Sequence, residues 1–231
     1  MQLVVHVPHA SVAIPENYRE PFLLTQAALE REAAVSADLH TDTLARAAWP
    51  QATIIEASVS RIVCDVERYS DDAREPMASR GRGMIYTATH DGKPLRRPLS
   101  AAERALIQRE LYARHWEYLR TTAADGILID LHSYPLDRWP VETVSSKAAR
   151  PEIDLGIDPE FTPPSWRDAL VTHFEGLGFN TAIDTPYAGV IDAGARAAVM
   201  IEIRRDVLSD PSSGPRWSRM VRALTKMPLP G

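Results

Sequence analysis

The sequence predicts an α/β protein built on a mostly parallel or mixed sheet with helices on both faces. Short apolar runs rich in Val and Ile recur along the chain, and longer stretches with helical spacing separate several of them. The expected strands cover residues 3–7, 52–59, 61–66, 126–131 and 198–203. A chain of 231 residues can form a sizeable core without a second domain, so we expect one domain over residues 1–231.

Helices are expected where apolar residues recur at helical spacing between these runs. The clearest begins at Ser100, whose side chain can cap the helix while Glu103 completes a capping box, and it continues until Gly126. A second is expected from Ser165 to about Leu177, where a glycine ends it. Further helices are expected at residues 26–33, 38–48 and 216–224.

Two long segments interrupt this alternation and are expected to run over the surface. Residues 70–98 are polar, rich in Arg, Gly and Asp, and show little periodicity. Residues 138–164 are broken up by prolines and follow a candidate site residue, His132, so we interpret them as either a lid or a contact between subunits. Loops of this length are often functional. The oligomeric state is left open.

The composition excludes several classes of partner. Hydrophobic residues make up 45% and charged residues 25% of the chain, and its net charge is -5. A negative chain is poorly suited to nucleic acid or anionic membranes, so neither is expected as a partner. The first apolar run is too short to span a membrane and lacks the features of a secretory signal, which predicts a cytoplasmic protein. The lone Cys64 excludes an internal disulfide, and its apolar neighbours predict a buried thiol.

Two histidines are placed at the ends of expected strands. His132 follows the run 126–131 within Asp-Leu-His-Ser-Tyr-Pro, and His9 follows the first run within Pro-His-Ala-Ser. The carboxyl ends of strands in a parallel sheet meet at one edge, so the two imidazoles are expected to come together. Two histidines and a carboxylate make a catalytic zinc site. For His9 taken alone, a structural role at the strand end is the alternative.

The carboxylate ligand is expected from Ser-Ala-Asp-Leu-His-Thr-Asp at residues 36–42. Asp38 is the first candidate because a helix is expected to begin there, and the alternative role is a helix cap. Asp42 lies one turn later on the same face and is the substitute. His40 is expected to point elsewhere. Asp130 is expected to orient a ligand through a hydrogen bond.

Glu202 is the candidate general base. It lies inside the last apolar run, where a carboxylate is costly unless it is paired or takes part in chemistry. Burial would raise its pKa towards the range useful for a general base. The alternative is a structural ion pair with Arg204 or Arg205.

Arginines flank the run at residues 61–66 and are candidates for holding an acidic substrate. Arg61 begins this run and Arg68 follows it. Guanidinium groups bind carboxylates through two parallel hydrogen bonds, which suits recognition of an anion by an otherwise acidic protein. The alternative is a structural network in which Asp65 and Glu67 neutralise the arginines.

Taken in chain order, these motifs resemble the N-formylglutamate amidohydrolase family. The resemblance runs from His9 to Asp206 and depends on the ordered set rather than on any one motif. The family is similar to zinc carboxypeptidases, which implies a three-layer αβα fold around a mixed, mostly parallel central sheet. A softer likeness covers residues 112–119 and includes His115. The two interpretations of His115 are contact with the site and a core position, and we favour the core position. Another likeness covers residues 186–189, which line the pocket in the family.

The resemblance also implies roles for single residues. It matches His9 and His132 to zinc ligands and Glu202 to the general base. The third ligand is assigned to Asp38, because Val12 stands where carboxypeptidases have a glutamate. The family's Asp-X-Asn-Arg element, which binds a substrate carboxylate, matches residues 65–68, with Glu67 in place of the asparagine. Arg68 would then hold the substrate, supported by Arg61 or Arg204.

These roles imply a zinc-dependent amidohydrolase that cleaves an N-formyl or related N-acyl amino acid, such as N-formylglutamate, and acts on a small acidic molecule. Zn²⁺ is the expected cofactor. Two alternatives stay open. One is a carboxypeptidase-like or deacylase activity on another acidic substrate, which Glu67 would favour. The other is a non-catalytic relative that has lost the metal.

Overall fold

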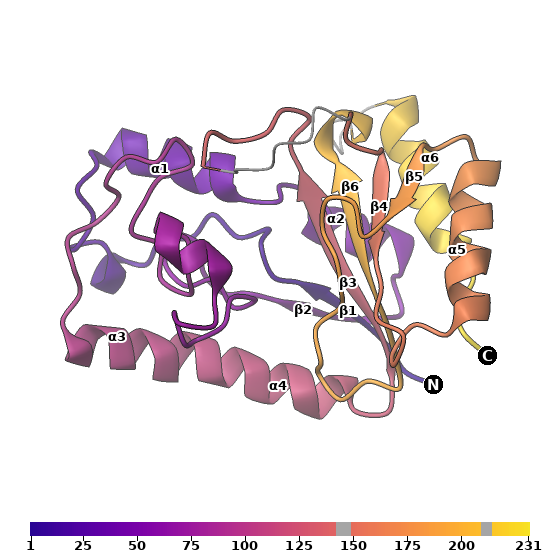
Figure 1. The fold of residues 1–231 in the computed structure, drawn as a ribbon, viewed down its shortest axis with the longest axis horizontal. Helices are drawn as coiled ribbons and strands as arrows, with labels where there is room; N and C mark the ends of the chain where they lie inside the picture. Colours follow the sequence, from indigo (N-terminus) through magenta and orange to yellow (C-terminus); the bar gives the residue numbers. More distant parts are fainter. Residues whose placement is uncertain (142–148, 209–213) are drawn as a thin grey trace.

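The computed structural model describes residues 1–141, 149–208 and 214–231, and a six-stranded mixed sheet forms its centre (Figure 1). Its strand order is β2-β1-β3-β6-β4-β5. The first four strands in this order are parallel, whereas β4 runs antiparallel to β6 and parallel to β5. This confirms the expected mixed, mostly parallel sheet. The strands are β1 Leu3–Val7, β2 Thr53–Glu56, β3 Ile127–Tyr134, β4 Ile153–Gly156, β5 Thr181–Ile183 and β6 Ala197–Arg204.

The helices lie largely where helical spacing predicts them. The capping box at Ser100 and Glu103 is present and begins a long helical stretch, in which a π-helical segment, Gln108–Ala113, separates α3 from α4. The helices are α1 Gln26–Ser36, α2 Thr41–Ala48, α3 Ala101–Ile107, α4 Arg114–Ala123, α5 Pro164–Gly176 and α6 Pro215–Thr225. Short 3₁₀ segments occur at Glu16–Tyr18, Pro76–Arg80 and Arg205–Val207.

Helices cover both faces of the sheet, as the alternation of strand side chains requires. Helices α2, α5 and α6 pack on one face against Val5, Ile129 and Ile201. Helix α4 packs on the other face against Val4 and Leu128. A third apolar cluster joins α1 to residues 57–66 and 84–86. Figure 1 shows α1 and α3 on the left, away from α5 and α6 on the right.

The strand register brings the expected site residues to one edge. His6 of β1 pairs with Asp130 of β3, and His132 of β3 pairs with Glu202 of β6. His9 follows two residues after β1 ends. Because β1, β3 and β6 are parallel, their carboxyl ends lie side by side and carry these side chains into the same region.

Two expectations about secondary structure are wrong, and two strands, β4 and β5, were not predicted. Residues 61–66 are buried but form turns rather than a strand. Their apolar side chains belong to the third cluster, and Val63 N donates to Ser60 O over 2.8 Å within a turn. The segment 138–164 is not wholly irregular, because it contains β4. The sequence also did not predict β5, which has only three residues. Residues 142–148 of the expected lid lie outside the described part of the chain.

Two expectations from composition can be compared with the structure. Cys64 is a free, buried thiol, and burial raises its pKa. Within the described residues, no helix has both the length and the apolar character needed to cross a membrane.

Candidate active site

A cavity of about 540 Å³ opens at the carboxyl ends of β3 and β6. This volume lies in the range of small-molecule sites. Its wall includes the two strand-end histidines, the loop at residues 186–189 and four arginines from residues 61–82, which are Arg61, Arg68, Arg80 and Arg82. The carboxylates that line it are Asp38, Glu67, Asp130 and Glu202.

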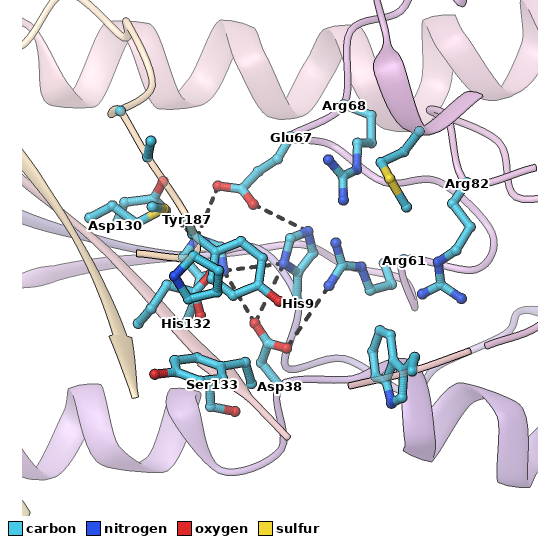
Figure 2. Close-up of a pocket in the computed structure, with 18 of the residues that line it drawn as sticks. His9, Asp38, Arg61, Glu67, Arg68, Arg82, Asp130, His132, Ser133 and Tyr187 are labelled. Carbon is cyan, nitrogen blue, oxygen red and sulfur yellow. Dashed lines mark hydrogen bonds and ion pairs between the residues drawn. The ribbon is translucent and has the colours of Figure 1, made fainter. Parts of the chain in front are cut away.

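The two strand-end imidazoles face each other inside this cavity, with Asp38 beside them (Figure 2). His9 Nδ1 lies 3.2 Å from His132 Nδ1. Asp38 Oδ2 lies 3.2 Å from His132 Nδ1 and 3.5 Å from His9 Nδ1. Two nitrogens and one carboxylate oxygen therefore form a nearly equilateral triangle, and all three residues are at most 3% exposed.

Hydrogen bonds at the far side of each imidazole favour the tautomer that a metal needs. His9 Nε2 donates to Asp65 Oδ1 over 2.9 Å. His132 Nε2 lies 3.1 Å from both Asp130 Oδ1 and Glu67 Oε1. When the Nε2 atoms carry the protons, both Nδ1 lone pairs point at each other and at the Asp38 carboxylate. Such an arrangement is repulsive unless a cation or a proton lies between the three atoms.

The donor set fits a zinc ion. Tetrahedral ligands at about 2.0–2.1 Å from zinc are about 3.3 Å from one another, which matches the sides of the triangle. His9, Asp38 and His132 could therefore hold the metal through Nδ1, Oδ2 and Nδ1. Two other groupings of the described residues also place their ligand atoms within 4.8 Å of one another, one of His9, Glu67 and His132 and one of His6, Glu67 and Asp130. We prefer the Asp38 side, because the Nε2 atoms that face Glu67 also have Asp65 and Asp130 as partners.

Asp38 reaches the site from a loop that leads into α2. Its backbone N–H donates to His9 O over 2.8 Å, which fixes the loop beside the end of β1. The residue that precedes α2 is His40, with φ 70°, so Asp38 is not the helix cap. Burial alone would raise the pKa of Asp38, but the neighbouring His132 and His9 imidazoles lower it well below its usual range. Arg205 Nη2 donates to Asp38 Oδ1 over 3.2 Å.

Asp42 and His40, the other carboxylate and imidazole of this segment, do not line the cavity. Asp42 is absent from the cavity wall and accepts a hydrogen bond from Thr43 Oγ1. His40 is exposed, as expected. The structure therefore places Asp38, and not Asp42, beside the two histidines.

The buried carboxylate of Asp65 contacts both His9 and the arginines. Its Oδ2 accepts from Arg61 Nε at 3.0 Å and Nη2 at 2.8 Å, and from the Tyr86 hydroxyl at 2.7 Å. Burial would raise the pKa of Asp65, but Arg61 and His9 hold it well below its usual range. Burial and Arg61 lower the pKa of His9, and the carboxylates of Asp65 and Glu67 offset them, so that it is raised overall.

The candidate substrate arginines are not equivalent. Arg61 lines the cavity, but its Nε and Nη2 are bonded to Asp65, which is the structural network considered as the alternative. Arg68 lines the cavity with looser ion pairs, 3.7 Å to Asp65 and 3.6 Å to Glu75. Arg204 does not line it, because its guanidinium bonds to Asp206 and to the carbonyl of Arg150. The expectation of substrate contact by Arg204 is therefore not supported, and Arg205 lines the cavity instead.

A chain of polar side chains behind the site was missed. His6 Nδ1 donates to Asp130 Oδ1 over 2.9 Å, and His6 Nε2 lies 2.8 Å from His115 Nε2 on α4. Burial and the neighbouring His6 lower the pKa of His115 to about 3. His115 is therefore partly buried and contacts His6 behind the site, rather than serving only as the core residue that we favour from the sequence. A polar residue inside the apolar run of β1 was the available signal, because alternation places His6 on the face that α4 covers.

Glu202 projects from β6 next to the paired His132. It is 7% exposed, and within the described chain its Oε2 has no hydrogen-bond partner. Burial raises the pKa of Glu202 to about 8, although His132 opposes the shift. The structure pairs it with neither Arg204 nor Arg205, so the alternative of a structural ion pair does not apply. An unpartnered buried carboxylate at a cavity wall is the geometry of a group awaiting a ligand or a proton.

The mixed sheet and the cluster of imidazoles and carboxylates at its strand ends define an α/β protein with the acid–base groups of a hydrolytic enzyme. The model of the N-formylglutamate amidohydrolase family matches residues 1–209. The chain belongs to the N-formylglutamate amidohydrolase family, a family of hydrolases.

Solved structures share the fold at low sequence identity. The chain is similar to an N-formylglutamate amidohydrolase from Ralstonia eutropha, with a TM-score of 0.79, 20% identity, and coverage of 97% of this chain and 90% of that one. It is also similar to a gene product of Agrobacterium tumefaciens, with a TM-score of 0.68, 19% identity, and coverage of 98% and 87%. No curated protein matches the sequence.

Proposed function

We propose that this protein is a zinc-dependent amidohydrolase that cleaves the amide of an N-formyl amino acid, with N-formylglutamate as the leading substrate. The observation that carries the proposal is the convergence of His9, Asp38 and His132 within 3.5 Å of one another beside the unpartnered carboxylate of Glu202. Membership in the amidohydrolase family supports the type of reaction.

The three converging residues would hold the metal, and the carboxylates behind them would keep their orientation. A bound zinc ion would supply Lewis-acid polarisation of the carbonyl and make a water molecule more acidic. Asp65 and Asp130 accept hydrogen bonds from the imidazoles and fix the ring planes. Arg205 holds the other oxygen of Asp38, so that Oδ2 faces the imidazoles.

Glu202 is proposed as the general base. Its free oxygen would accept a proton from the water that attacks the formyl carbon. When the carbon–nitrogen bond breaks, the same carboxyl would return the proton to the departing amine nitrogen, which leaves formate and a free amino acid. A base that is buried and free of ion pairs can exchange this proton without first breaking a structural bond.

Arg68 is proposed to hold the α-carboxylate of the substrate. It lies in the cavity wall with ion pairs longer than 3.5 Å, whereas Arg61 is committed to Asp65. A guanidinium that is only loosely paired can turn to a substrate carboxylate and position the scissile amide.

The test is a panel of N-formyl and N-acetyl amino acids, with amine release measured before and after treatment with a chelator. The proposal expects turnover of an N-formyl acidic amino acid, its loss on chelation and its return with zinc. A Glu202→Gln variant should keep its zinc and lose about 100-fold or more in kcat, while the exposed control Glu160→Gln stays active. Full activity in Glu202→Gln would refute the assigned base, and activity that survives complete removal of metal would refute the zinc dependence.

A further inference from the structure

Arg82 is a buried cation whose charged end lacks a hydrogen-bond partner. It is 2% exposed and lines the cavity. Within residues 1–141, 149–208 and 214–231, neither Nη1 nor Nη2 makes a hydrogen bond. The nearest carboxylate oxygen is Oε1 of Glu32, 4.0 Å from Nη1. That carboxylate is itself bonded to His90, through the backbone N–H at 2.7 Å and the imidazole Nδ1 at 2.7 Å.

Aromatic rings and a tight turn hold this guanidinium in place. Its Cζ lies 4.2 Å from the ring centroid of Tyr86 and 5.0 Å from that of Trp139. The preceding Gly81 has φ 72°, and a Cβ there would come within 2.7 Å of Ala88 Cβ, so the turn requires glycine. Aromatic contact stabilises the cation without occupying its N–H groups. These contacts hold the two Nη atoms of Arg82 in place, although neither makes a hydrogen bond within the described part of the chain.

A guanidinium in a cavity wall whose Nη atoms lack hydrogen bonds is suited to bind a carboxylate. A buried charge without hydrogen bonds is costly, and a planar anion with two oxygens would satisfy both Nη atoms at once. The neighbouring Arg61 already has a carboxylate partner, because its Nε and Nη2 both donate to Oδ2 of Asp65. Figure 2 places Arg61, Arg68 and Arg82 on the same side of the cavity, to the right of His132.

Arg82 is also linked to the proposed reaction centre. The Tyr86 ring that supports Arg82 donates its hydroxyl to Asp65, and Asp65 accepts from His9 Nε2. The Cζ atom of Arg61 lies 5.8 Å from the same ring centroid. One rigid group of side chains thus sets the position of Arg82 relative to the imidazoles.

We propose that Arg82 binds the second carboxylate of the substrate and makes the enzyme selective for N-acyl amino acids with an acidic side chain. The inference rests on the proposed function, in which Arg68 holds the α-carboxylate. Arg68 would position the scissile amide through the α-carboxylate, and Arg82 would bind the carboxylate of the substrate side chain. Arg82 is thus a specificity-determining residue for an acidic amino acid.

The test compares a charged and an uncharged side chain of the same shape. Values of kcat/KM are measured for N-formyl-L-glutamate and N-formyl-L-glutamine with the wild type, Arg82→Met, Arg82→Lys and the control Arg80→Met. Arg80 lines the same cavity, but its Nη1 donates to Val141 O. Calorimetric binding of L-glutamate and L-glutamine to the same proteins gives a readout that does not require turnover.

We expect the wild type to prefer the glutamate ligand by about 10- to 100-fold, the effect of a charge-assisted hydrogen-bonded pair. Arg82→Met should remove this preference without lowering activity on the glutamine substrate more than about threefold, Arg82→Lys should restore part of it, and Arg80→Met should keep it. The inference is overturned if Arg82→Met still discriminates or if the wild type never does. Selective binding of L-glutamate that depends on Arg82, without turnover of any amide, would support the subsite and refute the proposed reaction instead.

Discussion

Replacing Asp65 by asparagine tests the buried network that positions His9. Asp65 is 0% exposed and accepts hydrogen bonds from Arg61, Tyr86, His9 and the backbone N–H of Glu67. The amide keeps the shape of the side chain but removes its charge, and the closest remaining carboxylate is Asp38, 3.9 Å from Arg61 Nη1. Leaving a buried guanidinium uncompensated costs about 3–5 kcal/mol.

This loss is a large part of the about 5–15 kcal/mol that stabilises a typical domain. The assay is urea unfolding at neutral pH in the presence of a chelator, so that metal binding does not contribute. The matched control is Asp72→Asn, since Asp72 is half exposed and pairs with Arg104 at the surface over 2.9 Å, where a pair is worth about 1 kcal/mol or less. A loss below about 1 kcal/mol for Asp65→Asn, or equal losses for both variants, would refute the network as described.

Three further predictions concern the metal, the pH dependence and the core. Asp130→Asn removes a partner of His132 Nε2 and should lower zinc affinity about 10- to 100-fold in chelator competition; unchanged affinity would count against it. Burial raises the pKa of Asp154 to about 6. The free energy of unfolding of the wild type should therefore fall by up to about 3 kcal/mol, relative to that of Asp154→Asn, as the pH rises from about 4 to about 6. Urea titrations with a constant difference would exclude this. Phe174→Ala, in a fully buried position of α5, should cost about 3–5 kcal/mol, and a cost under about 1 kcal/mol would contradict the packing.

The sequence predicted the central strands because their signal is local. Apolar runs at β1, β3 and β6 alternate with helical spacing, and parallel strands bring their ends together, so His9, His132 and Glu202 could be expected at one edge. The structure brings these three side chains to one cavity. Family resemblance led to the same residues, and the family match over residues 1–209 confirms that resemblance.

The missed features depend on contacts between distant segments. Residues 61–66 look like a strand because they are apolar, but they are buried by α1 and by residues 84–86 without pairing in the sheet. The four-residue β4 lies within a proline-rich stretch, and its pairing with β6 is visible only in three dimensions. Burial predicted from composition does not by itself select strand over turn.

The alternation of side chains along a strand does not predict where Arg204 and Arg205 point. Arg204 ends β6, and Arg205 begins a 3₁₀ turn, so the direction of the side chains no longer follows the strand period. Arg205 therefore reaches Asp38 while Arg204 bonds to Asp206. Arg82 gave no signal at all in sequence, because it lies in a polar segment without periodicity, and only its burial without partners distinguishes it.

Zinc binding by His9, Asp38 and His132 is the central claim, and equilibrium competition with a chelator measures it directly. We expect about one zinc ion per wild-type chain, with His132→Ala and Asp38→Asn losing more affinity than the about 10- to 100-fold expected for an outer hydrogen-bond partner. The matched control Asp42→Asn should bind zinc like the wild type. Substoichiometric zinc in the wild type after loading, or unchanged affinity in the Asp38 and His132 variants, would contradict the account.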